Sequence, residues 1–211
     1  GCTVRLFEQV FNRFGLKTLW IDFTKSNIQE VIANHKPSMI WIESPTNPLL
    51  KIIDIEEICN FSNKMQIPVV VDNTFATPLL QRPLKLGATL SLTSTTKYIN
   101  GHSDALGGAV CTESSAWNDK LNFAQKALGL NPSPFDCWLI TRGIKTLPLR
   151  LERQIYNASK VANQLADNPL IKSVRYPFRN DHPQYKLAKR QMALGGAIVT
   201  AIVNASQDKT Y

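Results

Sequence analysis

Three short apolar runs, each ending in polar side chains, constrain the fold of this chain most. They cover residues 38–43, 67–72 and 89–93, and each has the length of a buried strand. Helical and strand signals alternate through residues 1–150, which is typical of an α/β layer around a mainly parallel sheet. In open α/β sheets, ligands collect outside the carboxyl ends of the strands. We therefore expect a functional site directly after these runs.

Lys97 follows the third run, within Ser94-Thr-Thr-Lys-Tyr-Ile-Asn-Gly-His-Ser-Asp104. A lysine flanked by small hydroxyl residues after a buried strand is poorly placed for an ordinary surface position. We therefore expect its amine to be withdrawn from water. Burial lowers the pKa of a lysine, and a neutral amine can form an imine with a carbonyl compound. The alternative is a solvated lysine in a strand-to-helix loop.

Polar residues at the other strand ends supply partners for this lysine. Asp72 ends the second run, and Asn47 lies in the Pro/Asn-rich loop after the first. Pyridoxal phosphate (PLP) fits this set, because a lysine can hold its aldehyde carbon while a carboxylate keeps the para ring nitrogen protonated. Asn47 could donate to the phenolic oxygen, and the hydroxyls of Ser94 and Thr96 could hold the phosphate. The pattern predicts a PLP site with Lys97 as its catalytic residue.

Three segments closely resemble the Cys/Met-metabolism family of PLP-dependent enzymes. They are Glu43-Ser-Pro-Thr-Asn-Pro48, Val71-Asp-Asn-Thr74 and the segment around Lys97. The likeness runs along essentially all 211 residues. It implies an aspartate-aminotransferase-like (fold type I) large domain with a mainly parallel sheet, followed by the start of a smaller C-terminal α/β domain.

The resemblance also assigns roles to individual residues. It implies that Lys97 forms the Schiff base with the cofactor and that Asp72 binds the pyridinium nitrogen. The other cofactor ligands are then Asn47, Ser94 and Thr96. Thr89 and Thr93 depart from the pattern, because the family often has an acidic residue and a histidine at these positions.

The reaction follows from the members of the family, which are cystathionine γ-lyase, cystathionine γ-synthase, cystathionine β-lyase and methionine γ-lyase. The resemblance implies β/γ-elimination or γ-replacement on sulfur amino acids. Residues 131–139 and 141–147 look most like cystathionine γ-lyases, which convert cystathionine to cysteine, 2-oxobutanoate and ammonia. Residues 107–110 would suit a cystathionine γ-synthase, which joins an O-acylhomoserine to cysteine, equally well. A PLP-fold protein that has lost catalysis and serves as an interaction module is the alternative from another class.

The resemblance further implies a homotetramer, built as a dimer of dimers with active sites shared between subunits. The family takes some phosphate contacts from an N-terminal region and its substrate-carboxylate arginine from the distal C-terminal domain, and neither region corresponds to residues 1–211. We therefore expect a fragment lacking both ends, inactive by itself. The apolar faces of the helices in 1–35 and 115–147 exceed what one sheet layer would cover, which suits a subunit interface.

Capping patterns predict where several helices begin and end. Candidate N-caps are Ser26 for residues 26–34, Asp54 with Glu57 for 55–65, Ser115 for a helix that Gly129 ends, and Ser133 before Pro134.

A long amphipathic helix marks the expected domain boundary. Apolar residues recur at helical spacing from Leu149 to Asp167, and Asn168-Pro169 ends the pattern. Strand-like runs follow at 171–175 and 197–203. We assign residues 1–148 to the PLP-binding large domain. Residues 149–211 are then the linking helix and the beginning of the small domain.

The net charge of +8 raises nucleic-acid binding as a rival function. The densest basic stretch consists of Arg175, Arg179, Lys186, Lys189 and Arg190. These residues are spread through a Pro-containing loop and a short helix, without a recognition module. We therefore expect a small-molecule amino-acid substrate and no nucleic-acid partner.

Cysteine, histidine and hydropathy patterns narrow the remaining classes. The four cysteines (Cys2, Cys59, Cys111 and Cys137) show no Cys-x-x-Cys spacing, so we expect reduced thiols in a cytoplasmic protein. The three histidines (His35, His102 and His182) are too dispersed to predict a metal site. The chain has no run of about 18 apolar residues, so we expect no membrane partner.

Overall fold

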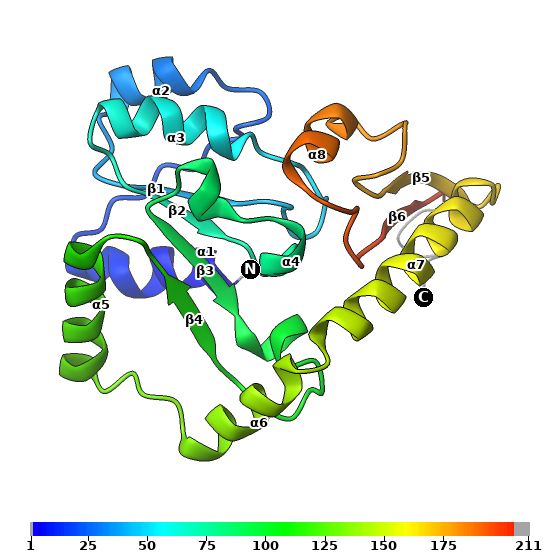
Figure 1. Cartoon of the computed structure of the whole chain (residues 1–211). Coiled ribbons are helices and arrows are strands. Elements are labelled where there is room, and N and C mark those ends of the chain that lie inside the picture. The colour runs from blue at the N-terminus through cyan, green and yellow to red at the C-terminus, as the bar shows by residue number, and fades with distance from the viewer. Residues whose placement is uncertain (1, 205–211) are drawn as a thin grey trace. The chain divides into compact units, whose positions relative to one another are not determined.

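The computed structural model describes residues 2–204, which divide into two units between Lys36 and Pro37 (Figure 1). The first unit consists of short helical turns followed by helix α2 (Ile28–His35). The turns are α1 (Cys2–Arg5), a π-helical turn (Leu6–Val10) and a 3-10 turn (Phe11–Phe14). The N-cap of α2 is Asn27, whose side chain accepts from the Gln29 amide, so the assignment to Ser26 was wrong by one residue. Asn27 is the cap because its backbone is still extended.

The second unit contains a four-stranded sheet in the order β1-β2-β3-β4. Its strands are β1 (Ile40–Glu43), β2 (Val69–Asp72), β3 (Leu90–Ser94) and β4 (Gly108–Cys111). The first three strands are parallel, and β4 is antiparallel to β3. In β2 all three valines are buried, as expected for a parallel strand covered on both faces. The predicted mainly parallel sheet is confirmed, and each apolar run forms a strand.

Helices α3 (Ile55–Lys64), α5 (Ser115–Leu128) and α6 (Pro134–Ile144) test the predicted caps. Asp54 accepts from the Glu57 amide, and Ser133 accepts from the Asp136 amide, so both N-caps are confirmed. The N-cap of α5 is Ser114, whose hydroxyl accepts from the Trp117 amide, and Ser115 is already the first helical residue. Gly129 ends α5 in the left-handed conformation, with φ of 67°.

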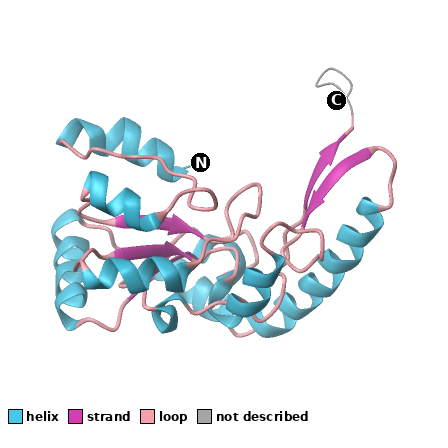
Figure 2. Ribbon diagram, turned by 90° about the horizontal axis from the view of Figure 1, so that it is seen from above, coloured by secondary structure: helices cyan, strands magenta, loops and turns pink. Residues whose placement is uncertain are grey.

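Helix α7 (Leu147–Ala166) joins the region of the four-stranded sheet to a second, two-stranded sheet (Figure 2). It begins two residues before the predicted start, because Pro148 is tolerated in a first helical turn. Strand β5 (Ile171–Arg175) pairs antiparallel with β6 (Thr200–Val203), and helix α8 (Tyr185–Gln191) lies between them in sequence. The strand expected at residues 197–203 corresponds to β6, which starts three residues later than expected.

One hydrophobic cluster joins segments that are far apart in sequence. Its buried members are Ile52, Ala76, Leu80, Ile99, Leu147, Leu151, Ile155, Ala188 and Met192. They come from the loop after β1, from the short helix α4 (Thr77–Leu80) and the residue before it, from the turn after β3, and from α7 and the α8 region. Side chains of α7 therefore pack directly under the turn that carries Lys97.

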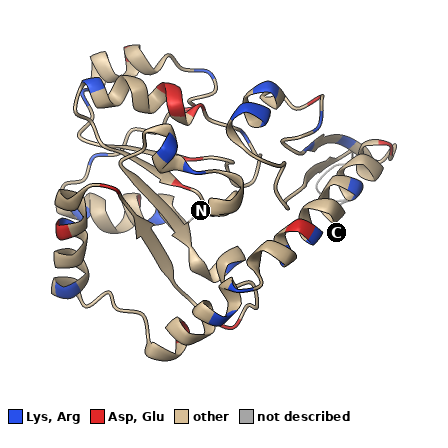
Figure 3. Ribbon diagram, in the orientation of Figure 1, with Lys and Arg blue, Asp and Glu red and all other residues tan. Residues whose placement is uncertain are grey.

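Three residues of the basic stretch make contacts within the chain. Arg179 pairs with Asp181, Arg190 pairs with Asp54, and the Lys189 ammonium lies 4.4 Å from the Phe178 ring centroid. Lys and Arg residues lie on several separate elements (Figure 3).

Residues 2–204 contain no helix that is both long and apolar enough to cross a membrane. Within the same part of the chain, no three His, Cys, Asp or Glu side chains gather as a metal site would require. All four cysteines are free thiols.

Candidate functional site

The carboxyl ends of β1, β2 and β3 meet at one edge of the sheet. Glu43, the last residue of β1, pairs in register with Asp72, the last residue of β2. Asp72 in turn pairs with Leu92 of β3, and the next amide, that of Asn73, donates to the Leu92 carbonyl at 2.8 Å. Asp72 therefore lies between the ends of two neighbouring parallel strands, as a ligand-binding edge requires.

Thr74 connects Asp72 to the start of the lysine segment. The Asp72 Oδ1 atom accepts from the Thr74 amide at 3.0 Å and from its hydroxyl at 2.6 Å. The same hydroxyl oxygen accepts from the Ser94 amide at 2.9 Å. These bonds fix the Asp72 carboxylate relative to the end of β3. Sequence reasoning assigned no role to Thr74, although a threonine two residues after a strand-ending aspartate is typical of a local side-chain turn.

Lys97 lies in a π-helical turn (Thr95–Ile99) that follows β3 directly. Its own backbone is not helical, with φ of −89° and ψ of −116°. Its side chain is exposed in this chain, so the expectation of an amine withdrawn from water was wrong. The reason is that Thr95 and Ile99 take the buried side of the turn, at 8% and 7% exposure.

Lys97 lines an open cleft with a volume of about 760 Å³. This size lies within the range of small-molecule sites. Other lining residues are Phe75, Thr96, Tyr98, Asp104 and Gln154. Burial raises the pKa of the Tyr98 phenol, which stays protonated and able to donate at neutral pH. Of the five predicted site residues, Lys97 and Thr96 line this cleft, whereas the other three do not.

Thr96 is hydrogen-bonded to Gly107, the residue directly before β4. Its hydroxyl oxygen accepts from the Gly107 amide at 2.9 Å and donates to the Gly107 carbonyl at 3.2 Å. The neighbouring Thr95 Oγ1 is buried and has no hydrogen-bond partner among the described residues. A Cβ on Gly107 would lie 2.7 Å from that oxygen, so a side chain cannot fit there. To bind a phosphate, the Thr96 hydroxyl would have to turn away from the Gly107 carbonyl, because a phosphate oxygen needs a donor.

Asn47 lies in the loop after β1 and is exposed. Its backbone amide, not its side chain, donates to Glu43 Oε1 at 2.9 Å. Burial raises the pKa of the Glu43 carboxyl, the hydrogen bond from Asn47 opposes this rise, and the nearby charge of Asp72 adds to it. Glu43 thus orients the start of the loop that presents Asn47.

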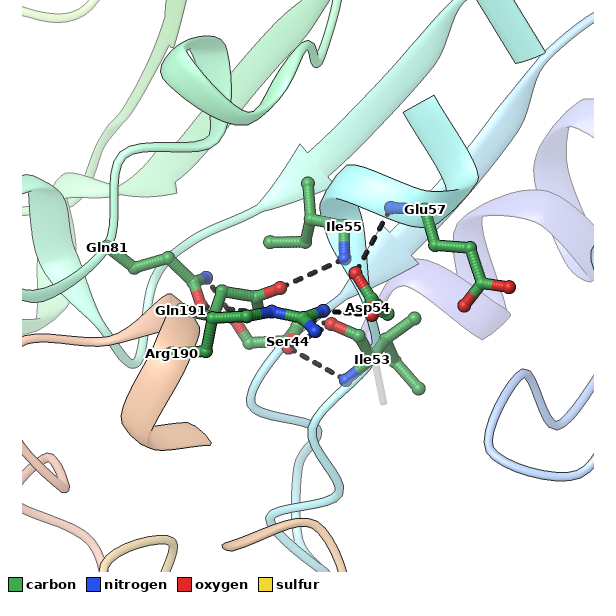
Figure 4. Close-up of polar contacts among 8 residues, drawn as sticks. All are labelled: Ser44, Ile53, Asp54, Ile55, Glu57, Gln81, Arg190 and Gln191. Carbon is green, nitrogen blue, oxygen red and sulfur yellow. Dashed lines mark hydrogen bonds and ion pairs between the residues drawn. The ribbon is translucent and has the colours of Figure 1, made fainter. Parts of the chain in front are cut away.

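A buried amide network holds the base of the same loop (Figure 4). Gln81 Nε2 donates to the Ser44 carbonyl at 2.7 Å and to Asn73 Oδ1 at 2.9 Å. Gln191 Nε2, from α8, donates to Gln81 Oε1 at 2.9 Å and to the Ile53 carbonyl at 3.0 Å. The network therefore connects residues that directly follow β1 and β2 to helix α8.

Helix α8 also holds the segment where the loop enters α3. Gln191 Oε1 accepts from the Ile55 amide at 3.0 Å, and Arg190 pairs with Asp54 (Figure 4). Earlier in the same loop, the Leu50 carbonyl is bonded at 3.1 Å to Nε2 of His182, which lies before α8. These partners lie over 130 positions apart in sequence, so no local pattern could have indicated them.

The fold and these polar strand ends define an α/β protein with a lysine-bearing turn at the ligand-binding edge of its sheet. The family described as "Cys/Met metabolism PLP-dependent enzyme" matches residues 1–210. The chain belongs to this family of PLP-dependent lyases and synthases, and the resemblance noted from its motifs is confirmed.

Individual relatives carry different activities in their names. A cystathionine gamma-lyase from Sus scrofa is 46% identical over 192 residues, which cover 90% of this chain and 47% of the relative. A probable cystathionine gamma-synthase from Herpetosiphon aurantiacus is 41% identical over 208 residues, covering 99% and 65%. The crystal structure of cystathionine gamma synthase from Xanthomonas oryzae pv. oryzae in complex with aminoacrylate and cysteine superposes with a TM-score of 0.93 at 37% identity, covering 98% and 53%. The chain thus spans about half to two thirds of the length of these proteins.

Proposed function

We propose that this chain forms the lysine-bearing part of a PLP-dependent trans-sulfuration enzyme that has the substrate choice of a cystathionine γ-lyase. Such an enzyme would cleave cystathionine to cysteine, 2-oxobutanoate and ammonia. The observation that carries the proposal is the position of Lys97 directly after β3, next to the strand whose carboxyl end presents Asp72. The relationship to a cystathionine gamma-lyase over 90% of the chain supports the choice.

The donor set fits PLP. Lys97 offers an exposed amine in a cleft of small-molecule size, and Asp72 offers a carboxylate that Thr74 already orients. Asp72 would keep the ring nitrogen protonated, and Asn47 would donate to the phenolic oxygen. Ser94 and Thr96 would hold the phosphate. When bound, PLP supplies an electron sink for negative charge that develops at the substrate Cα.

The chain's own residues then have separate tasks in the reaction. Lys97 Nζ would hold the cofactor until the substrate amine replaces it, and would then accept the proton from the substrate Cα. Asp72 would stabilise the resulting charge without moving, because Thr74 and the strand register hold its carboxylate. Proton loss at Cβ would permit the γ substituent to leave.

Replacing Lys97 with alanine tests this proposal in the protein that carries the chain. We expect the variant to lose the cofactor absorption at about 420 nm, because the covalent link through Nζ can no longer form. Borohydride reduction and peptide mass spectrometry should place the cofactor on Lys97 in the unaltered protein. Lys172→Ala, on the exposed part of β5, is the matched control and should keep the band. A Lys97→Ala variant that retained both the band and turnover would refute the assignment.

A cystathionine γ-synthase activity is the second candidate. The Herpetosiphon relative and the Xanthomonas structure favour it, and residues 107–110 suit it equally well. Incubation with cystathionine should give 2-oxobutanoate and cysteine if the protein is a γ-lyase. Incubation with cysteine and an O-acylhomoserine should give cystathionine if it is a γ-synthase.

The proposal extends to domains and assembly. Residues 1–148 would belong to the cofactor-binding large domain and 149–211 to the linking helix and the beginning of the small domain. We further propose a homotetramer with sites shared between subunits. Large exposed apolar side chains on and between α5 and α6 support a subunit interface there, and they include Phe123, Leu128, Leu130, Phe135 and Trp138. The free thiols support a reducing, cytoplasmic compartment.

A further inference from the structure

We propose that Arg150 is a positioning residue that holds the Lys97 turn from the side of α7. The inference rests on the proposed role of Lys97 and adds a residue to it. Arg150 lies in the first turns of α7, 53 positions after the lysine, and sequence analysis assigned it no role.

The Arg150 guanidinium donates to the carbonyls that directly follow Lys97. Nη1 donates to the Tyr98 carbonyl at 3.0 Å, and Nη2 donates to the Ile99 carbonyl at 3.3 Å. The same Nη2 donates to the Gly143 carbonyl at 2.9 Å, and Nε donates to Thr146 Oγ1 at 2.9 Å. One planar group thus connects the lysine turn to the end of α6 and the start of α7.

These carbonyls need such a donor because the turn is short and irregular. The last carbonyls of any helical segment have no partner within it, and a positive charge at that end is favourable. Here the backbone at Lys97 leaves the helical conformation, so the carbonyls after it cannot continue a regular ladder. A guanidinium can donate to several of them at once in a rigid fork, which a lysine ammonium cannot reproduce.

Two glycines show how closely the surrounding chain packs on this contact. A Cβ on Gly101 would lie 2.0 Å from Arg150 Nη1, and a Cβ on Gly143 would lie 2.2 Å from the Asn100 carbonyl oxygen. Asn100 itself is fully buried. Arg150 therefore lies in a space that only glycine leaves open, and the turn has little room to shift while the guanidinium is present.

The consequence for the site follows from the exposure of Lys97. The lysine side chain lines the open cleft, so the position of Nζ depends on the backbone of its turn more than on side-chain packing. A displacement of about 1 Å at a reacting group can lower turnover by about 100-fold. Loss of the Arg150 contacts should therefore impair the reaction without removing any group that touches the substrate.

The test compares Arg150→Ala and Arg150→Lys with Arg153→Ala in the protein that carries the chain. Arg153 is an exposed arginine on the same helix whose guanidinium lies over the Tyr156 ring, so it is the matched control. The first readout is amide hydrogen exchange of the cofactor-free protein. The Asn100 and Gly101 amides donate to the Thr95 and Lys97 carbonyls, and their exchange should accelerate by about tenfold or more in both Arg150 variants. Exchange in β5 should stay unchanged.

The second readout is the steady-state kinetics of the enzyme with PLP bound. In both Arg150 variants we expect kcat to fall by about 10- to 100-fold while KM changes by less than about threefold. We also expect weaker visible circular dichroism of the cofactor, since its orientation depends on Lys97. Arg150→Lys keeps the positive charge but lacks the planar guanidinium. A low kcat in this variant would therefore support the need for the guanidinium, even if Arg150→Ala unfolds.

Unchanged exchange at residues 97–101 together with unchanged kcat in Arg150→Lys would overturn the inference. The proposed function fails differently: borohydride would then not label Lys97 in the unaltered protein. In that case the exchange measurement would still decide whether Arg150 holds the turn, because it requires no cofactor.

Discussion

Replacing Gln81 with leucine would remove the centre of the buried amide network while keeping a side chain of similar size. Gln81 is 2% exposed, and its side-chain amide makes three hydrogen bonds. Its partners are the Ser44 carbonyl, Asn73 Oδ1 and Gln191 Nε2. Ser44 and Asn73 are fully buried, so water cannot replace the lost bonds at their side of the network.

The expected loss of stability follows from the two fully buried partners that are left without their bond to Gln81, since the third partner, Gln191, is half-buried and still donates to the Ile53 carbonyl. Each buried polar group that loses its partner costs about 1 to 3 kcal/mol, so the two together cost about 2 to 6 kcal/mol. Burial of the leucine side chain offsets about 2 kcal/mol. We expect a net loss of about 2 kcal/mol, and Tm should fall by about 4 to 8 °C, because a unit of this size loses about 2 to 4 °C per kcal/mol.

Thermal unfolding followed by circular dichroism measures this effect. Gln164→Leu is the control, because Gln164 is an exposed glutamine on α7, and its Tm should stay within about 1 °C of the unaltered protein. PLP affinity should also fall in Gln81→Leu, since Ser44 begins the loop that presents Asn47. A Tm for Gln81→Leu within about 2 °C of the control would refute the reasoning that this network is satisfied and stabilising.

Two further predictions concern Gly143 and His182. Gly143→Ala should destabilise the protein by about 1 to 3 kcal/mol or more in urea unfolding, because the new Cβ would lie 2.2 Å from the Asn100 carbonyl oxygen. Gly108→Ala is the control, because the nearest atom to its new Cβ would lie at 3.8 Å, and its free energy of unfolding should change little. His182 is 4% exposed, its Nδ1 accepts from the Gln184 amide, and its Nε2 therefore donates to the Leu50 carbonyl as a neutral ring. Burial lowers the pKa of His182 below its usual 6.5, although the Leu50 bond partly opposes this. The unfolded chain then binds more protons, so the free energy of unfolding should decline as the pH falls below about 6.5, and urea unfolding at pH 5 and pH 8 should show a smaller difference for His182→Asn.

Local patterns in the sequence were sufficient for most elements of the fold. The three apolar runs became strands because a parallel sheet buries both faces, and Asp54 and Ser133 became N-caps because their side chains reach the amides three residues ahead. Ser26 and Ser115 were misassigned by one residue, because a neighbouring side chain can cap equally well and the backbone decides which one does. The roles of Asp72, Asn47, Ser94 and Thr96 stay predictions.

The sequence by itself determined the chemistry at the strand ends and the family to which the chain belongs, since both depend on residue types at short spacing. Only the tertiary structure decided how that chemistry is held. The exposure of Lys97 depends on which side of its turn packs into the core, and the contacts of Arg150 and Gln191 join residues about 50 and 110 positions apart. Such contacts depend on the positions of whole helices against the sheet, which no pattern within one segment specifies.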